Sequence, residues 1–232
     1  RRQLYHGIPR LKPAELQMIE AILFDFDGTI ADTAPDLGHA LNRQRISRGL
    51  SPLPITLIRT QASAGSRGLL NLGFNLKPGD SEYEAMRDEF LRFYDERLCH
   101  DTRLFPGIAN VLDQLDANQL PWGIVTNKPA RFTKPLVQAL ALHQRAACII
   151  SGDETVNTKP HPEPLLTACR RINVSPNKCI YLGDDIRDIK ASLAAGIKPI
   201  VARYGYLGND TSPETWGAAH LIDHPEDLLN YI

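Results

Sequence analysis

Two aspartates, Asp25 and Asp27, directly follow a short apolar run in the stretch AILFDFDGT. Residues two positions apart on an extended chain point to the same side, so both carboxylates would face one side of a strand end. Two such carboxylates repel each other unless a cation or a shared proton relieves them. Gly28 permits a turn and Thr29 offers a hydroxyl donor. Taken alone, this pattern is equally typical of a helix cap or an Asx-turn.

Similar polar groups follow three other apolar runs. Thr126 and Asn127 stand in VTNK, where a hydroxyl and an amide can bind phosphoryl oxygens. Lys159 precedes a proline in TKP, which favours an extended lysine. The third group is acidic and consists of Asp184, Asp185 and Asp188 in GDDIRD.

These residue types together indicate one chemistry. Carboxylate oxygens suit Mg²⁺, which binds through one or two carboxylates together with a substrate phosphate. A lysine and a hydroxyl neutralise an anionic substrate, and a nearby carboxylate can attack phosphorus to form an acyl-phosphate. The sequence therefore predicts magnesium-dependent phosphoryl transfer.

The elements that must position these groups alternate along the chain. We expect strands at residues 21–25, 122–126, 148–151, 179–183, 199–202 and 221–222. Helices are expected at residues 110–117, 130–140, 163–172 and 185–195. Such alternation predicts an α/β fold, a Rossmann-like doubly wound parallel sheet with helices on both faces. Ligands bind such sheets outside the carboxyl ends of the strands, where all the polar groups above would lie.

One long segment interrupts the alternation. Residues 36–100 contain no convincing strand, and helices are expected at residues 35–48, 54–62, 66–72 and 81–98. We therefore expect a helical cap domain at residues 35–104, a catalytic core at residues 21–34 and 105–232, and an N-terminal extension at residues 1–20.

The cap has one candidate substrate-binding residue, Arg67. In ASAGSRGLL two glycines flank this arginine, which predicts a flexible loop that reaches a carboxylate on the substrate. The alternative is an ordinary turn between helices with a solvent-facing arginine.

Composition excludes several other classes of protein. The chain of 232 residues is 43% apolar and has a net charge of −1, so neither a nucleic-acid surface nor an acidic tail is expected. An apolar run long enough to span a membrane, or of signal-peptide type, is missing from the sequence. The four cysteines form no C-x-x-C pair, and the histidines lack zinc-ligand spacing. We expect a cytoplasmic monomer or homodimer whose partner is a small phosphate ester, not nucleic acid or a membrane.

The motifs DFDGT, VTN, TKP and GDDIRD, in this order, resemble those of the haloacid dehalogenase superfamily of phosphohydrolases. The resemblance extends over residues 21–232. Within the superfamily the chain is similar to the phosphoglycolate phosphatase-like group with a helical cap. The stretches VTNKPARFTKPL, GDDIRDI and RYGY further resemble bacterial N-acetylmuramic acid 6-phosphate phosphatases, which act in peptidoglycan recycling.

The resemblance implies a catalytic role for four residues, Asp25, Asp27, Thr126 and Lys159, and a substrate-binding role for Asn127. Asp25 would be the nucleophile, and Asp27 would protonate the leaving alcohol and later deprotonate the hydrolytic water. Thr126 would bind the transferring phosphoryl group, with Asn127 nearby. Lys159 would offset the negative charge of Asp25 and of the phosphate.

The resemblance also implies a set of Mg²⁺ ligands. Asp25 and Asp184 would bind the ion through their carboxylates, and Asp27 through its backbone carbonyl. Either Asp185 or Asp188 would hold a metal-bound water or orient the lysine, and the sequence does not distinguish them.

The substrate implied is a small phosphate ester that carries a carboxylate. N-acetylmuramic acid 6-phosphate is the first choice, and phosphoglycolate is the alternative; Arg67 would bind the carboxylate of either. A sugar phosphomutase is a weaker alternative, because it needs a bisphosphate intermediate and a cap that excludes water.

Overall fold

The computed structural model describes residues 18–209 and 211–232. Most of the expected N-terminal extension, residues 1–17, lies outside the described residues. Its last residues lead directly into the sheet, where the Glu20 amide donates a hydrogen bond to the Lys178 carbonyl at 2.8 Å.

A six-stranded parallel sheet forms the centre of the fold, in the order β5-β4-β1-β6-β7-β8. All six predicted strands are confirmed to within one residue at each end. Their bounds are β1 Ala21–Phe24, β4 Trp122–Val125, β5 Cys148–Ile150, β6 Cys179–Gly183, β7 Lys198–Ala202 and β8 His220–Ile222.

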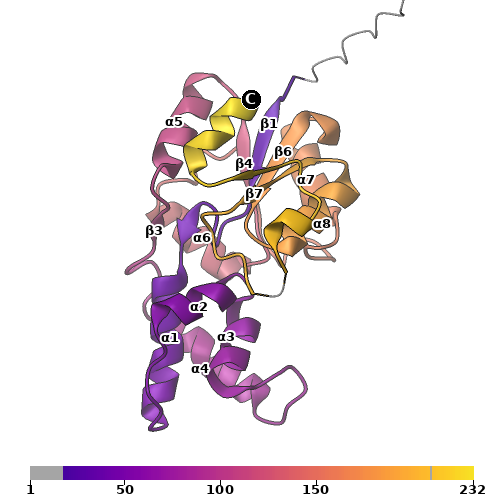
Figure 1. Cartoon of the computed structure of the whole chain (residues 1–232). Helices are drawn as coiled ribbons and strands as arrows, with labels where there is room; N and C mark the ends of the chain where they lie inside the picture. The colour runs from indigo at the N-terminus through magenta and orange to yellow at the C-terminus, as the bar shows by residue number, and fades with distance from the viewer. Residues whose placement is uncertain (1–17, 210) are drawn as a thin grey trace, which may run out of the picture.

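Helices cover both faces of this sheet, which confirms the doubly wound α/β fold (Figure 1). Alternate residues of β1 face opposite sides: Ile22 and Phe24 pack in the cluster that contains α5 and α6, whereas Leu23 packs with α7 and α8. The helices are α5 Ile108–Ala117, α6 Ala130–Ala139, α7 Glu163–Ile172 and α8 Ile186–Ala195, with the short helices η1 Pro176–Lys178, η2 Pro213–Thr215 and η3 Pro225–Tyr231.

Residues 36–100 are mainly helical, as predicted. The helices here are α1 Ala34–Ser47, α2 Ile55–Ala62, α3 Gly65–Phe74 and α4 Tyr83–Asp95. They lie together beyond the carboxyl ends of the central strands (Figure 1).

The prediction of a flexible glycine loop around Arg67 is wrong, whereas the helix expected at residues 66–72 is present as α3. Gly65 to Gly68 form the first turn of α3. A side chain at Gly68 would collide with Ala64 Cβ, so this glycine permits close packing against the preceding turn. Arg67 therefore projects from a helix rather than from a mobile loop.

A two-stranded antiparallel sheet was not predicted. The strands β2 Ala31–Asp32 and β3 Arg103–Leu104 pair where the chain enters and leaves the helical segment. Each strand has only two residues, too few for a recognisable alternation of apolar and polar side chains.

Among the described residues, no helix is both long enough and apolar enough to cross a membrane.

Candidate active site

Three carboxylates converge at the carboxyl ends of adjacent strands. Asp25 follows β1, and its amide donates a hydrogen bond to the Leu182 carbonyl of the neighbouring β6 at 2.9 Å. This pairing brings Asp25 beside Asp184 and Asp188, and one oxygen from each of the three carboxylates lies within 4.8 Å of the others. All three side chains are buried.

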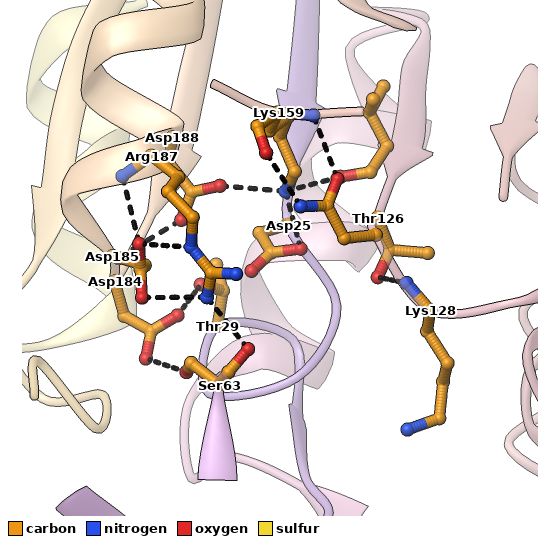
Figure 2. A network of polar contacts seen from close by, with 12 residues as sticks. Asp25, Thr29, Ser63, Thr126, Lys128, Lys159, Asp184, Asp185, Arg187 and Asp188 are labelled. Carbon is orange, nitrogen blue, oxygen red and sulfur yellow. Dashed lines mark hydrogen bonds and ion pairs between the residues drawn. The ribbon is translucent and has the colours of Figure 1, made fainter. Parts of the chain in front are cut away.

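Lys159 binds two of these carboxylates (Figure 2). Its Nζ lies 2.8 Å from Asp25 Oδ1 and 2.7 Å from Asp188 Oδ1. It also donates to the Tyr181 hydroxyl at 2.7 Å, a partner that the sequence analysis missed. Burial alone would lower the pKa of Lys159, but Asp188 and Asp25 raise it above its usual value, so the ammonium stays charged.

The structure gives Asp188 and Asp185 different contacts, although the sequence alone could not distinguish their roles. Asp188 lies among the clustered carboxylates and contacts Lys159. Asp185 instead caps α8 and pairs with Arg187, whose Nε lies 2.8 Å from Asp185 Oδ1 (Figure 2). Arg187 was also missed by the sequence analysis.

The clustered carboxylates repel one another at close range. Burial, and then the charge of Asp188, raise the pKa of Asp25 to about 7. Burial and Asp25 raise the pKa of Asp184 well above its usual value. A bound divalent cation would remove this penalty. Carboxylate oxygens at this separation are the donor set that Mg²⁺ prefers, so these residues fit the expected ion.

Hydrogen bonds fix the orientation of Asp184. Its oxygens accept from the hydroxyls of Thr29 at 3.2 Å and Ser63 at 2.9 Å, and from the Tyr206 amide at 2.8 Å. Gly28 is required beside it because the backbone φ is +85° and a Cβ would collide with Asp184 Oδ2.

Asp27 has its own ammonium partner, Lys128, which the sequence analysis did not single out. Lys128 Nζ donates to Asp27 Oδ1 at 2.8 Å, and the Thr33 hydroxyl donates to the same oxygen at 2.6 Å. Burial alone would lower the pKa of Lys128, but Asp27 and then Tyr94 raise it. The position of Lys128 immediately after Asn127 was the signal that could have revealed it.

Thr126 and Asn127 occupy different places at the end of β4. Thr126 is buried at the wall of the cavity described below, and its hydroxyl accepts a hydrogen bond from the Lys128 amide at 3.1 Å. The side-chain amide of Asn127 accepts a hydrogen bond from the backbone N–H of Lys159 and donates one to the backbone carbonyl of Lys159, both at 2.9 Å. Asn127 therefore holds the backbone that carries the lysine.

A cavity of about 330 Å³ connects these residues with the helical segment. Asp25, Asp27, Thr126 and Lys159 line its core end. Among the lining residues from the helical segment are Ser63, Arg67, Tyr83, Arg87, Phe90, Leu91 and Tyr94. Arg67 is exposed at the rim, and within the described ranges its guanidinium forms no ion pair.

Known proteins resemble this chain over nearly its whole length. It is 40% identical over 214 residues to an N-acetylmuramic acid 6-phosphate phosphatase of Pseudomonas putida, covering 92% of this chain and 96% of that one. It is 39% identical over 208 residues to a phosphoglycolate phosphatase of Xanthomonas campestris, covering 90% and 94%. The crystal structure of a predicted phosphoglycolate phosphatase from Haemophilus somnus superposes with a TM-score of 0.80 at 25% identity, covering 91% and 97%.

Residues 22–202 match the family of haloacid dehalogenase-like hydrolases. This range contains Asp27, the residues that line the cavity, and the acidic cluster of Asp25, Asp184 and Asp188. The chain therefore belongs to the haloacid dehalogenase-like hydrolases.

Proposed function

We propose that this chain is a magnesium-dependent phosphomonoester hydrolase that transfers the phosphoryl group first to Asp25 and then to water. One observation carries the proposal: at the end of the cavity the buried Asp25 carboxylate lies 2.8 Å from Lys159 Nζ, beside Asp184 and Asp188. The relatives named as phosphatases support it.

The first step forms a bond between an Asp25 oxygen and phosphorus while the bond from phosphorus to the ester oxygen breaks. Asp27 gives its proton to that ester oxygen, which leaves as the alcohol. Thr126 and Lys159 bind the phosphoryl oxygens, since both line the cavity beside Asp25.

The second step returns Asp25 to its starting state. Asp27 takes a proton from water as the water oxygen bonds to phosphorus, and the bond from phosphorus to Asp25 breaks. Inorganic phosphate leaves, and Asp27 is protonated again. Asp188 positions Lys159 throughout, while Asp185 fixes Arg187 at the cavity wall.

Asp25, Asp184 and the Asp27 backbone carbonyl would hold Mg²⁺, with Asp188 beside them, and the ion would supply positive charge against the phosphate.

The substrate we propose is N-acetylmuramic acid 6-phosphate. Relatives from Pseudomonas putida and Pseudomonas aeruginosa, 40% and 37% identical, are named for that substrate. A cavity of about 330 Å³ falls in the size range of sites for drug-sized ligands, whereas phosphoglycolate has only two carbons. Phosphoglycolate is the second candidate, because the Xanthomonas campestris relative is named for it.

The helical segment, residues 35–104, is proposed to be a cap that closes over the substrate, with Arg67 among the substrate-binding residues. A cytoplasmic location is proposed because the four cysteines are free thiols.

The test is phosphate release with Mg²⁺ from the two esters, compared by kcat/KM. We expect a preference for the muramic acid ester, and we expect Asp25→Asn to abolish turnover while its circular dichroism and melting temperature remain close to wild type. The exposed Asp88→Asn is the matched control. Release by Asp25→Asn at the wild-type rate would refute the proposed nucleophile, and no release from any ester, including an aryl phosphate, would refute the hydrolase.

A further inference from the structure

Helix α4 presents one face to the cavity. Tyr83, Arg87, Phe90 and Tyr94 all line it, at successive spacings of four, three and four residues. This is the spacing of a single helical stripe. The stripe is aromatic except for Arg87, so one guanidinium stands among rings that would contact an apolar or sugar surface.

Tyr94 marks the end of the stripe nearest the reacting groups. The ammonium of Lys128, which pairs with Asp27, lies 5.0 Å from the centre of the Tyr94 ring. The Tyr94 hydroxyl is buried and has no hydrogen-bond partner in the part of the chain that the structure describes. A buried, unpaired hydroxyl at the cavity wall calls for a polar atom of a ligand.

Arg87 stands farther along the stripe, between Tyr83 and Phe90. It precedes Tyr94 by seven residues, a rise of about 10 Å along a helix. Its ion pair is with Glu84 at 3.5 Å, on side chains that are 41% and 73% exposed, and such a pair contributes little.

We infer that Arg87 binds the second anionic group of the substrate and sets the distance at which that group must lie from the phosphate. This inference rests on the proposed phosphatase function and names the feature that selects its substrate. A guanidinium suits this task because it can donate two hydrogen bonds to one carboxylate.

The distance that a ligand must span between Asp25 and Arg87 favours a long ester. Three bonds separate phosphorus from the carboxyl carbon of phosphoglycolate, which places these atoms at most about 4 Å apart. Eight bonds separate them in N-acetylmuramic acid 6-phosphate, about 10 Å when extended. Because Asp25 and Arg87 line the same cavity on different elements, we infer that the longer ester is the one that engages both residues together.

Arg67 serves a different part of the cavity. It lies four residues after Ser63, which ends α2 and whose hydroxyl donates to Asp184 at 2.9 Å. That contact places the residues just before α3 near the acidic end, and Arg67, exposed at the rim, lines the cavity from a different helix than Arg87.

The test compares Arg87→Ala with wild type on two sugars that differ only in the 3-O-lactyl group, which carries the carboxylate: N-acetylmuramic acid 6-phosphate and N-acetylglucosamine 6-phosphate. We expect the variant to raise KM for the muramic acid ester by about 10- to 100-fold, with kcat changed less than about twofold, because a charge-assisted contact is lost. Hydrolysis of the N-acetylglucosamine ester should be unchanged, and Arg87→Lys should recover part of the loss.

The matched control is Arg92→Ala, on the same helix but outside the cavity lining. Equal effects of Arg87→Ala on both sugars, or no effect on either, would overturn the inference. A wild-type preference for phosphoglycolate would also overturn it but would leave the phosphatase chemistry intact. Failure of wild type to release phosphate from any ester would instead overturn the proposed function, and the inference with it.

Discussion

Two lysines hold the two aspartates to which we assign the chemistry. Lys159 pairs with Asp25, and Lys128 pairs with Asp27. Both lysines are enclosed by the protein, and a buried ammonium is tolerated only with its partners in place. Each lysine therefore fixes the position of one carboxylate.

At this scale we predict that Lys128→Met lowers kcat by about 10- to 100-fold. This is part of the rate enhancement that a well-positioned proton-transfer group such as Asp27 supplies. Methionine keeps the apolar stem but leaves Asp27 without the ammonium that contacts its Oδ1 at 2.8 Å. Steady-state kinetics with a good leaving group, an aryl phosphate, should show a smaller loss, because such a group needs little protonation. Lys134→Met, at an exposed site on α6, is the control. An equal loss with both leaving groups would contradict a role through Asp27.

At the scale of elements, one buried carboxylate joins the two chain segments that lead into and out of the helical insertion. Asp36, in the first turn of α1, accepts hydrogen bonds from the amide and the hydroxyl of Thr102, both at 2.8 Å, and from the Asp101 amide at 3.0 Å. Thr102 directly precedes β3, which pairs with β2. The hydrogen bonds of Asp36 and the pairing of β2 with β3 therefore stabilise the same junction.

We predict that Asp36→Ala lowers the free energy of unfolding by about 2–4 kcal/mol, because buried donors lose a charged acceptor. Urea denaturation measures the change. The exposed Asp88→Ala on α4 removes a carboxylate without such contacts and should change stability by less than about 0.5 kcal/mol. Similar urea midpoints for Asp36→Ala and wild type would show that the hydrogen bonds of Asp36 do not stabilise the junction.

At the scale of the whole molecule, folding assembles an acidic cluster that costs free energy without a cation. The pKa of Asp25 is raised to about 7 by burial and by Asp188, and that of Asp184 is raised by burial and by Asp25. The folded state therefore binds protons more tightly than the unfolded chain. These carboxyls lower stability progressively as the pH rises from about 4 through about 7 in the absence of a cation.

Mg²⁺ must compete with those protons. We predict that saturating Mg²⁺ raises the melting temperature more at about pH 8 than at about pH 5, because the ionised carboxylates bind the ion and binding stabilises the folded state. Thermal melts with and without Mg²⁺ measure this, and Asp184→Asn should remove most of the shift. A Mg²⁺ shift that is larger at the lower pH would contradict the proposed ligands.

The sequence by itself determined the six strands, the helices between them and the helical insertion. These depend on local patterns, because apolar runs form buried strands and turn residues end them. It also placed Asp25, Thr126 and Asp184 directly after strands, and Lys159 in the loop that follows β5, and the carboxyl ends of parallel strands share one edge of the sheet.

Only the tertiary structure decided which of these side chains meet. Lys159 contacts Asp188 rather than Asp185, and these partners are 29 positions apart in the sequence. Lys128 contacts Asp27, which is 101 positions away. The cavity-facing stripe of α4 likewise depends on packing between helices. Side-chain contacts follow from strand order and helix orientation, and neither is a local property of the sequence.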